Sequence, residues 1–225
     1  MHNRARSETT MNRSKIITTI FLDIGGVLLT DGWSRGAGRL AAKTFHLDVE
    51  DLKDRHNQAL DTYEKGKFTL DEFLDRMVFY KKRSFSRAQF RKFMFAQSKA
   101  YPKMIELIRR LKARYDLKIV VVSNEGRELN EYRIHKFKLD AFVDVFISSC
   151  YVRLRKPDAE IFRVALDTVR VPAGQVLYLE NTQMFVEVAE GLGIRGILHT
   201  DYKSTCVKLA SFGLQYDGGT IHEAR

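Results

Sequence analysis

The chain has 225 residues, which suffices for one domain of ordinary size or for a core domain with a small insert. Its hydrophobic fraction of 44% and charged fraction of 29% are typical of a soluble globular protein. Two cysteines without CxxC spacing exclude a disulfide scaffold and a zinc knuckle, and no run approaches the roughly 20 apolar residues that span a bilayer. The cysteine usage predicts a cytoplasmic protein, and the lack of a long apolar run predicts no membrane partner.

The net charge of +10 favours an anionic partner, either a phosphorylated small molecule or a nucleic acid. Basic residues between 81 and 92 alternate with phenylalanines, superficially like a surface that stacks single strands. However, Ser86 and Gln89 form a capping box that Phe85 and Phe90 flank as a hydrophobic staple, so a helix start explains the aromatics. The sequence therefore favours a small phosphorylated substrate over nucleic acid, and a monomer or a homodimer.

Residues 1–15 are predicted to form a disordered basic leader, with Met11 as a candidate natural start. The apolar run 16–22, rich in β-branched residues, predicts a buried parallel strand that Asp23 ends. A carboxylate there lies at the edge of the sheet where open α/β folds hold their ligands. Gly25 and Gly26 allow a tight turn and a close approach of the backbone to a ligand.

Residues 32–99 carry helical signals only. Asp48 is a helix-capping residue, Thr69 and Glu72 form a second capping box, and Gly66 ends the preceding helix. We therefore expect an insert of four helices after the first strand.

From residue 101 onward the pattern alternates between helix and strand, beginning with Pro102 at a helix start. The expected strands are 119–122, 145–148, 176–179 and 196–199, and the expected helices 128–137, 159–169, 184–191 and 205–212. This alternation predicts a parallel sheet with right-handed crossovers. The core would comprise 16–31 and 100–215, followed by a frayed tail at 216–225.

Polar residues also follow three later strands. Ser123-Asn124 follows 119–122, Arg155-Lys156-Pro157-Asp158 opens a helix after 145–148, and Glu180-Asn181 follows 176–179. With Asp23, this order resembles the haloacid dehalogenase superfamily of hydrolases, most of which are phosphatases. The resemblance extends from about residue 16 to about 214.

The segments 155–157, 179–181 and 191–194 look most like the small sugar-phosphate phosphatase branch of that superfamily. The resemblance implies a three-layer Rossmann-like α/β fold with strand order 5-4-1-2-3 and a cap inserted after the first strand. This order would place the ends of strands 1, 2 and 4 side by side.

The resemblance implies a magnesium-dependent phosphatase that hydrolyses a small phosphorylated metabolite, for example a sugar phosphate, through an aspartyl-phosphate intermediate. Asp23 is the predicted nucleophile, and the predicted catalytic set is Asp23, Ser123 and Lys156. The predicted phosphate-binding residues are Gly25, Gly26, Ser123, Asn124 and Lys156. Trp33, Arg153 and Arg155 are candidate contacts for the leaving group.

The predicted Mg²⁺ ligands are Asp23, the carbonyl of Gly25, Glu180 and Asn181. Glu180 stands where the family usually has aspartate, and Asn181 keeps an oxygen at the next acidic position without the charge. The alternative for Glu180 is an ion pair with Lys156. Phe185 replaces an asparagine that many relatives have.

Gly25 is the sharpest departure, because most phosphatases of the superfamily carry a general acid at this position. Such an acid accelerates the reaction about 10²–10⁴-fold. We therefore expect the rate to fall steeply as the leaving group becomes more basic, unless a residue between 32 and 99 donates the proton.

Two alternatives follow from the same departures. A 2-haloacid dehalogenase needs no proton donor, and a non-catalytic binding protein could use the same fold.

Overall fold

The computed structural model describes residues 16–33 and 35–215. The predicted leader 1–15, the start at Met11 and the tail 216–225 lie outside the described residues. Within the described ranges, none of the helices combines the length and the apolar composition that a membrane crossing requires.

Five parallel strands form one sheet in the order β3-β2-β1-β4-β5, which confirms the expected order. The strands are β1 Thr19–Leu22, β2 Lys118–Ser123, β3 Val145–Ser148, β4 Val176–Glu180 and β5 Arg195–Leu198. β1 begins at Thr19, later than residue 16, because its two neighbours begin there: Thr19 pairs with Lys118 and with Val176.

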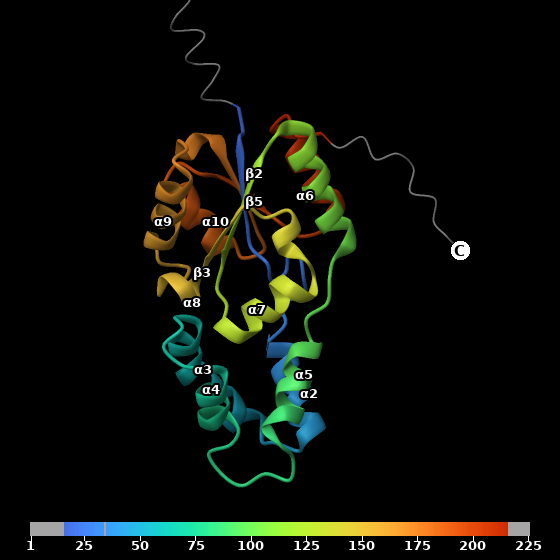
Figure 1. The fold of residues 1–225 in the computed structure, drawn as a ribbon, viewed down its shortest axis with the longest axis vertical. Helices are drawn as coiled ribbons and strands as arrows, with labels where there is room; N and C mark the ends of the chain where they lie inside the picture. Colours follow the sequence, from blue (N-terminus) through green and yellow to red (C-terminus); the bar gives the residue numbers. More distant parts are fainter. Residues whose placement is uncertain (1–15, 34, 216–225) are drawn as a thin grey trace, which may run out of the picture.

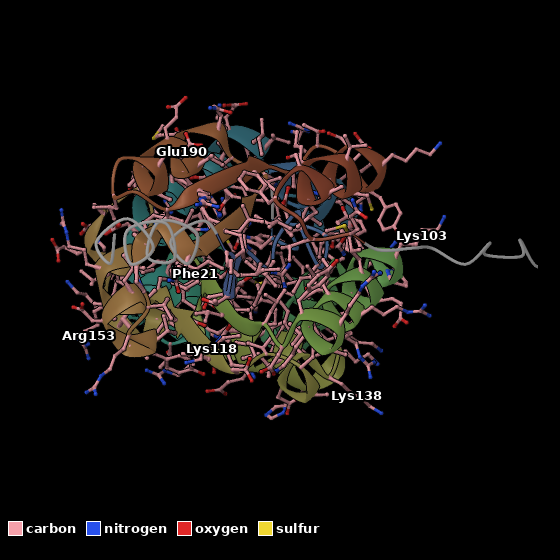
Figure 2. The ribbon with its side chains drawn as sticks, turned by 90° about the horizontal axis from the view of Figure 1, so that it is seen from above. Phe21, Lys103, Lys118, Lys138, Arg153 and Glu190 are labelled. Atoms are coloured by element: carbon pink, nitrogen blue, oxygen red, sulfur yellow. The ribbon has the colours of Figure 1, made fainter. Side chains whose placement is uncertain are left out.

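Helices cover both faces of the sheet and make three layers (Figure 1). The covering helices are α6 Pro102–Tyr115 and α11 Tyr202–Ser211 on one face, and α9 Glu160–Val169 and α10 Gln183–Glu190 on the other. Ile20 and Leu22 pack toward α6, whereas Phe21 packs toward α9, as the alternation of side chains along a strand requires. Figure 2 shows Phe21 in the interior, with Lys103 and Glu190 at the rim.

Two features of the helices differ from the sequence-based expectation by more than one residue. α11 begins three residues before 205, because the Asp201 carboxylate accepts a hydrogen bond from the Ser204 N–H and caps the helix. A short helix, α8 Ser149–Val152, follows β3 directly. Lys156 therefore lies in the turn before α9 and does not open a helix. Its peptide bond to Pro157 is cis.

Between β1 and α6 the described residues form four helices, which we call the helical insert. They are α2 Arg35–Phe45, α3 Val49–Glu64, α4 Leu70–Met77 and α5 Arg87–Ala96. Both capping boxes are present, and Gly66 follows α3 with a φ of +63°. The insert lies at one end of the molecule (Figure 1) and has its own apolar core, which includes Phe90 and against which the half-buried Phe85 and Phe93 pack.

Arg133, on α7 Arg127–Lys136, ties together the two segments that connect the insert to the core. Its side chain is 1% exposed and donates to the Thr30 carbonyl at 2.6 Å and to the Ser98 hydroxyl at 3.0 Å. The carboxylate of Glu125 is its ion-pair partner. The N–H of Thr30 also donates to the carbonyl of Lys99 at 2.8 Å. The start and the end of the insert are therefore held to each other and to α7.

Candidate active site

Asp23 stands at the carboxyl end of β1 and contacts the neighbouring strand β4 and the turn that follows β1. Its N–H donates to the Leu179 carbonyl at 3.0 Å, and its carboxylate oxygen Oδ1 accepts from the Ile24 N–H at 2.8 Å. Burial raises the pKa of Asp23 to about 7. The Lys156 ammonium lowers this pKa, and the Glu180 carboxylate raises it further. The side chain keeps 13% exposure, so the carboxylate still reaches a cavity.

Lys156 is buried among three oxygen atoms at the strand ends. Its Nζ lies 2.6 Å from Glu180 Oε2, 3.0 Å from the Tyr178 hydroxyl and 3.3 Å from Asp23 Oδ1. Burial by itself lowers the pKa of Lys156, but the carboxylates of Asp23 and Glu180 outweigh it, so this pKa lies above its ordinary value. A charged ammonium therefore stands beside Asp23, as the sequence predicts.

Glu180 is fully buried and both of its oxygens already accept hydrogen bonds. Oε1 accepts from the N–H groups of Asn181 and Thr182 at 2.9 Å each, and Oε2 accepts from Lys156 and Tyr178. The structure thus shows the ion pair with Lys156 that was the alternative for this residue. Direct ligation of a metal by Glu180 would have to break these bonds, so the geometry does not favour that prediction.

Asn124 holds the lysine loop in place. Its amide oxygen accepts from the Lys156 N–H at 2.8 Å, and its amide nitrogen donates to the Lys156 carbonyl at 2.9 Å. Both of its polar ends thus pair with the Lys156 backbone, although Asn124 also lines the cavity. Its contact with a phosphate stays a prediction. Ser123, at the end of β2, hydrogen-bonds the Asp23 side chain and lines the cavity, where we had expected it.

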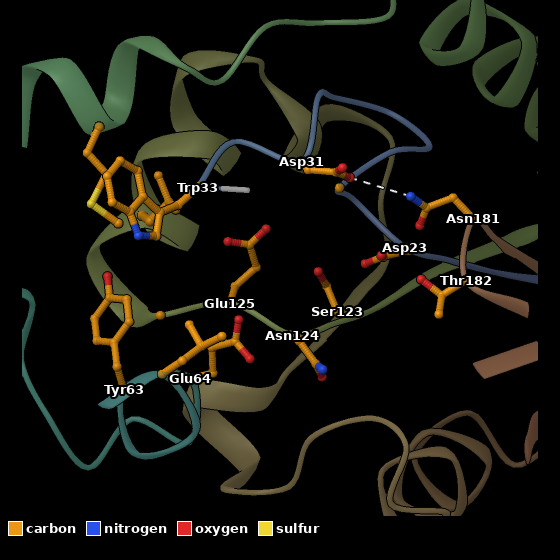
Figure 3. Close-up of a pocket in the computed structure, with 15 residues that line it drawn as sticks. Asp23, Asp31, Trp33, Tyr63, Glu64, Ser123, Asn124, Glu125, Asn181 and Thr182 are labelled. Carbon is orange, nitrogen blue, oxygen red and sulfur yellow. Dashed lines mark hydrogen bonds between the residues drawn. The ribbon is translucent and has the colours of Figure 1, made fainter. Parts of the chain in front are cut away.

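A cavity of about 240 Å³ lies between the strand ends and the helical insert (Figure 3). The strand ends contribute Asp23, Ser123 and Asn181 to its wall. The insert and the segment before it contribute Asp31, Trp33, Leu60, Tyr63, Glu64 and Met94. Gly25 lines the cavity, and a side chain at Gly26 would collide with the amide of Asn181. This is the turn that the sequence predicts to approach a ligand.

Two polar atoms on the insert side of the cavity are buried with neither a hydrogen-bond partner nor an ion-pair partner among the described residues. They are the indole Nε1 of Trp33 and the hydroxyl of Tyr63. Trp33 packs against Phe90 with ring centroids 5.7 Å apart, and Tyr63 stacks on Phe73 at 4.4 Å. Packing thus fixes both rings in the cavity wall.

Of the two arginines predicted as substrate contacts, neither is free at the cavity. Arg155 forms an ion pair with Glu64 of the insert at 2.7 Å, which joins the insert to the lysine loop. Arg153 is exposed and lies at the rim of the molecule (Figure 2). Trp33 does line the cavity.

Four carboxylates face this cavity, of which the sequence analysis identified only Asp23. Burial raises the pKa of Glu64 against the opposing charge of Arg155, and it raises the pKa of Glu125 against that of Arg133. Asp31 is exposed, and its Oδ1 accepts from the Asn181 amide nitrogen at 3.4 Å. No periodic pattern surrounds Asp31 in the sequence. Only the presence of a carboxylate so close to the glycine turn could have indicated that Asp31 faces the cavity.

Phe185, where many relatives have asparagine, places its ring centroid 5.1 Å from Lys156 Nζ. The aromatic face therefore lies beside the ammonium in place of a polar side chain.

The described residues contain no cluster of three or more histidine, cysteine or acidic side chains spaced to hold a metal ion. The cavity wall nevertheless includes three residues that carry hard oxygen donors: Asp23 has a carboxylate, Gly25 a backbone carbonyl and Asn181 an amide oxygen. Since the amide nitrogen of Asn181 points to Asp31, its oxygen lies on the other side of the group. Such a mixed set suits Mg²⁺, which keeps several waters and takes few protein ligands.

Residues 17–193 match the family model of the haloacid dehalogenase-like hydrolases. The chain belongs to this family. The expected superfamily and its hydrolase class are thereby confirmed.

Two curated relatives are phosphatases. A phosphorylated carbohydrates phosphatase of Thermotoga maritima is 28% identical over 60% of this chain and 59% of its own length. A sesquiterpene phosphatase of Aspergillus oryzae is 24% identical over 48% of this chain and 54% of its own length. The chain thus spans little more than half the length of the curated relatives it matches.

Solved structures share the fold over most of their length. One is a haloacid dehalogenase-like family enzyme of Bacteroides thetaiotaomicron, solved in complex with magnesium and inorganic phosphate. It has a TM-score of 0.71 and 20% sequence identity, and the match covers 84% of this chain and 98% of that enzyme. An L-2-haloacid dehalogenase of Xanthobacter autotrophicus has a TM-score of 0.58 and 13% identity, with 89% and 85% covered. At these identities the likeness shows the fold alone.

Proposed function

We propose that this chain is a Mg²⁺-dependent phosphatase that hydrolyses a small phosphate ester with a hydroxylated leaving group, such as a sugar phosphate. The observation that carries the proposal is the buried Lys156 ammonium, which lies 3.3 Å from the carboxylate of Asp23, a residue that lines a small cavity. An enzyme that transfers a phosphoryl group needs both a nucleophile and positive charge on the phosphoryl oxygens. The two phosphatase-named relatives support the same reaction.

Asp23 would attack phosphorus with the carboxylate oxygen that the Ile24 N–H does not hold. Oδ1 is held by the Ile24 N–H and faces Lys156, so we assign the attack to Oδ2. The attack forms an aspartyl-phosphate, which water then hydrolyses. Lys156 and the Ser123 hydroxyl would balance the charge of the transferred oxygens, while Asn124 and Glu180 hold the lysine in position.

Asp23, the carbonyl of Gly25 and Asn181 would hold the Mg²⁺ ion, which supplies positive charge to the phosphoryl oxygens when bound. Asn181 brings no charge of its own. We therefore expect a weaker metal site than one with a further carboxylate.

The helical insert would act as a cap that keeps bulk water from the reaction. Its wall favours a hydroxylated leaving group, because the Trp33 indole N–H and the Tyr63 hydroxyl are buried without partners. A buried polar atom without a partner costs about 1–3 kcal/mol, and a ligand hydroxyl would remove that penalty. A purely hydrocarbon leaving group would leave it in place.

The proposal is tested by initial rates of phosphate release from sugar phosphates, from an isoprenoid phosphate and from p-nitrophenyl phosphate, with Mg²⁺ and with chelator. We expect release that requires Mg²⁺ and is fastest with sugar phosphates. Halide release from a 2-haloacid that persists in chelator would establish the dehalogenase alternative instead. Binding of phosphate esters without release of either product would establish the binding protein.

A further inference from the structure

We propose that the substrate carries an ammonium group as well as a phosphate, so that its leaving group is an amino alcohol or an amino sugar. This inference rests on the proposed phosphatase function and narrows its substrate class. It comes from the composition of the cavity wall. The described residues that line the cavity include four with carboxylates and no lysine, arginine or histidine.

Glu64 and Glu125 bring the negative charge that an ammonium group would meet. Glu64, the last residue of α3, pairs with Arg155 through Oε2 at 2.7 Å. Glu125, which follows β2, pairs with Arg133 through Oε1. The second oxygen of each carboxylate accepts no hydrogen bond in the described part of the chain. Figure 3 shows both carboxylates directed into the open space of the cavity.

The charged groups around the cavity leave a negative excess. Three cations pair with four of the five carboxylates at or beside the cavity. The carboxylates are those of Asp23, Asp31, Glu64, Glu125 and Glu180, and the cations are Arg133, Arg155 and Lys156. A Mg²⁺ ion and a phosphate ester dianion would cancel each other's charge, so the excess remains when both are bound. A positively charged leaving group would reduce it, whereas a neutral one would not.

The hydroxyl of Tyr63 is an independent indication of a ligand at the same wall. The residue is 2% exposed, and its hydroxyl has no hydrogen-bond partner among the described residues. This oxygen lies at the cavity, because a β-carbon built on Gly126, which also lines the cavity, would be 2.5 Å from it. A tyrosine hydroxyl can accept a hydrogen bond from an N–H group as well as donate one. Together with the two carboxylates it offers acceptors to the three donors of an ammonium group.

Trp33 contributes a donor, which suits a hydroxyl group on the same ligand. Its indole N–H is buried without a partner among the described residues, and an indole nitrogen can only donate. The wall thus combines one place for a hydroxyl oxygen with several acceptors for an ammonium group. A positive charge on the leaving group would also stabilise the negative charge that develops on the leaving oxygen. That help is relevant here, because Gly25 supplies no proton donor.

The test compares kcat/KM, in the presence of Mg²⁺, for pairs of phosphates that differ only by an ammonium or a hydroxyl group at one carbon. The pairs are 2-aminoethyl and 2-hydroxyethyl phosphate, 3-aminopropyl and 3-hydroxypropyl phosphate, and glucosamine 6-phosphate and glucose 6-phosphate. We expect at least one ammonium substrate to exceed its hydroxyl partner by about 10-fold or more, the scale of a hydrogen bond to a charged group. If the glucosamine ester is preferred, its N-acetyl derivative, in which the nitrogen is uncharged, should lose the advantage.

Two variants on α3 separate recognition of the charge from a structural role. Glu64→Gln keeps the shape of the side chain and removes its charge, so the preference for the ammonium substrate should fall about 10-fold while the hydroxyl substrate changes little. Asp61→Asn is the matched control. Asp61 lies one turn earlier, also faces Arg155 at 3.8 Å, and is not among the described residues that line the cavity. This variant should keep the preference.

The outcomes distinguish this inference from the proposed function. Phosphate release without an ammonium preference in any pair would overturn the inference and leave the phosphatase standing. A preference that survives Glu64→Gln, or that both variants reduce equally, would overturn it as well. An equal loss on all substrates in Glu64→Gln, with a higher Mg²⁺ requirement, would overturn it and make Glu64 a metal ligand. A parent that releases phosphate from none of these esters nor from p-nitrophenyl phosphate would refute the proposed function, and this inference with it.

Discussion

The wall of the cavity formed by the strand ends differs from the wall formed by the helical insert in how its polar atoms are satisfied. At the strand ends, Lys156 lies among three oxygens and Glu180 accepts four hydrogen bonds. On the insert side, the polar atoms of Trp33 and Tyr63 have no partner among the described residues.

This difference suits the two walls to different roles, one in the reaction and one in ligand recognition. A satisfied network holds charges in one arrangement, as the attack on phosphorus requires. Polar atoms without a hydrogen-bond partner in a cavity lower the stability of the free protein, and a ligand that pairs with them removes that cost. We infer that the strand-end wall sets the reaction and the insert wall selects the leaving group. The predictions below test each wall.

The largest effect is expected from Asp23→Asn, which removes the nucleophile from the strand-end wall. Activity on p-nitrophenyl phosphate should fall by at least about 10³-fold, the scale on which other enzymes lose rate with their nucleophile. Circular dichroism should show an unchanged fold. A variant as active as the parent would refute attack by Asp23.

Lys156→Met should remove both activity and stability. The side chain is 1% exposed, and its loss leaves two buried carboxylates without their cation. We expect a decrease of about 3–5 kcal/mol in the free energy of unfolding, measured by urea denaturation. Lys103→Met, at an exposed lysine, is the control and should change little. A stable Lys156→Met protein would mean that the network contributes little to the fold.

The sequence predicted the strand-end wall because its chemistry follows from local pattern. Buried strands are short apolar runs, and a polar residue directly after such a run lies at the ligand edge of a parallel sheet. Asp23 and Ser123 are found there, and Lys156 reaches the same edge from the turn before α9. The same pattern could not show that Asn124 turns to the Lys156 backbone, because a strand end does not reveal which way a polar side chain points.

The insert wall was harder to predict because its residues come from a loop and from helix faces. Tyr63 lies on the buried face of α3, where helical spacing indicates core packing and not a cavity. Asp31 lies in a loop without periodicity. The ion pair between Glu64 and Arg155 joins residues far apart in the chain, so only the tertiary structure shows it. The four-residue helix α8 is too short to give a periodic pattern.

The burial of Asp23 predicts a pH-dependent stability that the asparagine variant should lack. Burial raises the pKa of Asp23 to about 7 from its ordinary value of 3.8, so the folded protein binds this proton more tightly than the unfolded chain does. The contribution of this group is fully present below pH 3.8 and is lost as the pH rises to about 7.

Urea denaturation in chelator checks this, since chelator removes any metal charge. Between these pH values the parent should lose at most about 1.4 kcal/mol per pH unit relative to Asp23→Asn, and above pH 7 the difference should stay constant. Parallel pH curves for the two proteins would show that Asp23 is ionised throughout, with Lys156 outweighing its burial.

The smallest effects are expected on the insert wall, from Tyr63→Phe and Trp33→Phe. Both changes keep an aromatic ring against Phe73 or Phe90 and remove the polar atom that has no partner. A neutral hydrogen bond contributes about 0.5–1.5 kcal/mol, so kcat/KM for a sugar phosphate should fall about 2- to 10-fold with each variant. For p-nitrophenyl phosphate, kcat/KM should stay unchanged.

Tyr63→Phe should also raise the free energy of unfolding slightly, by about 1 kcal/mol, because a buried hydroxyl without a partner is gone. Tyr101→Phe, at a tyrosine with 39% exposure, is the control. Equal losses on both substrates would show that these residues shape the cavity without recognising hydroxyl groups, and the division of work between the two walls would then be wrong.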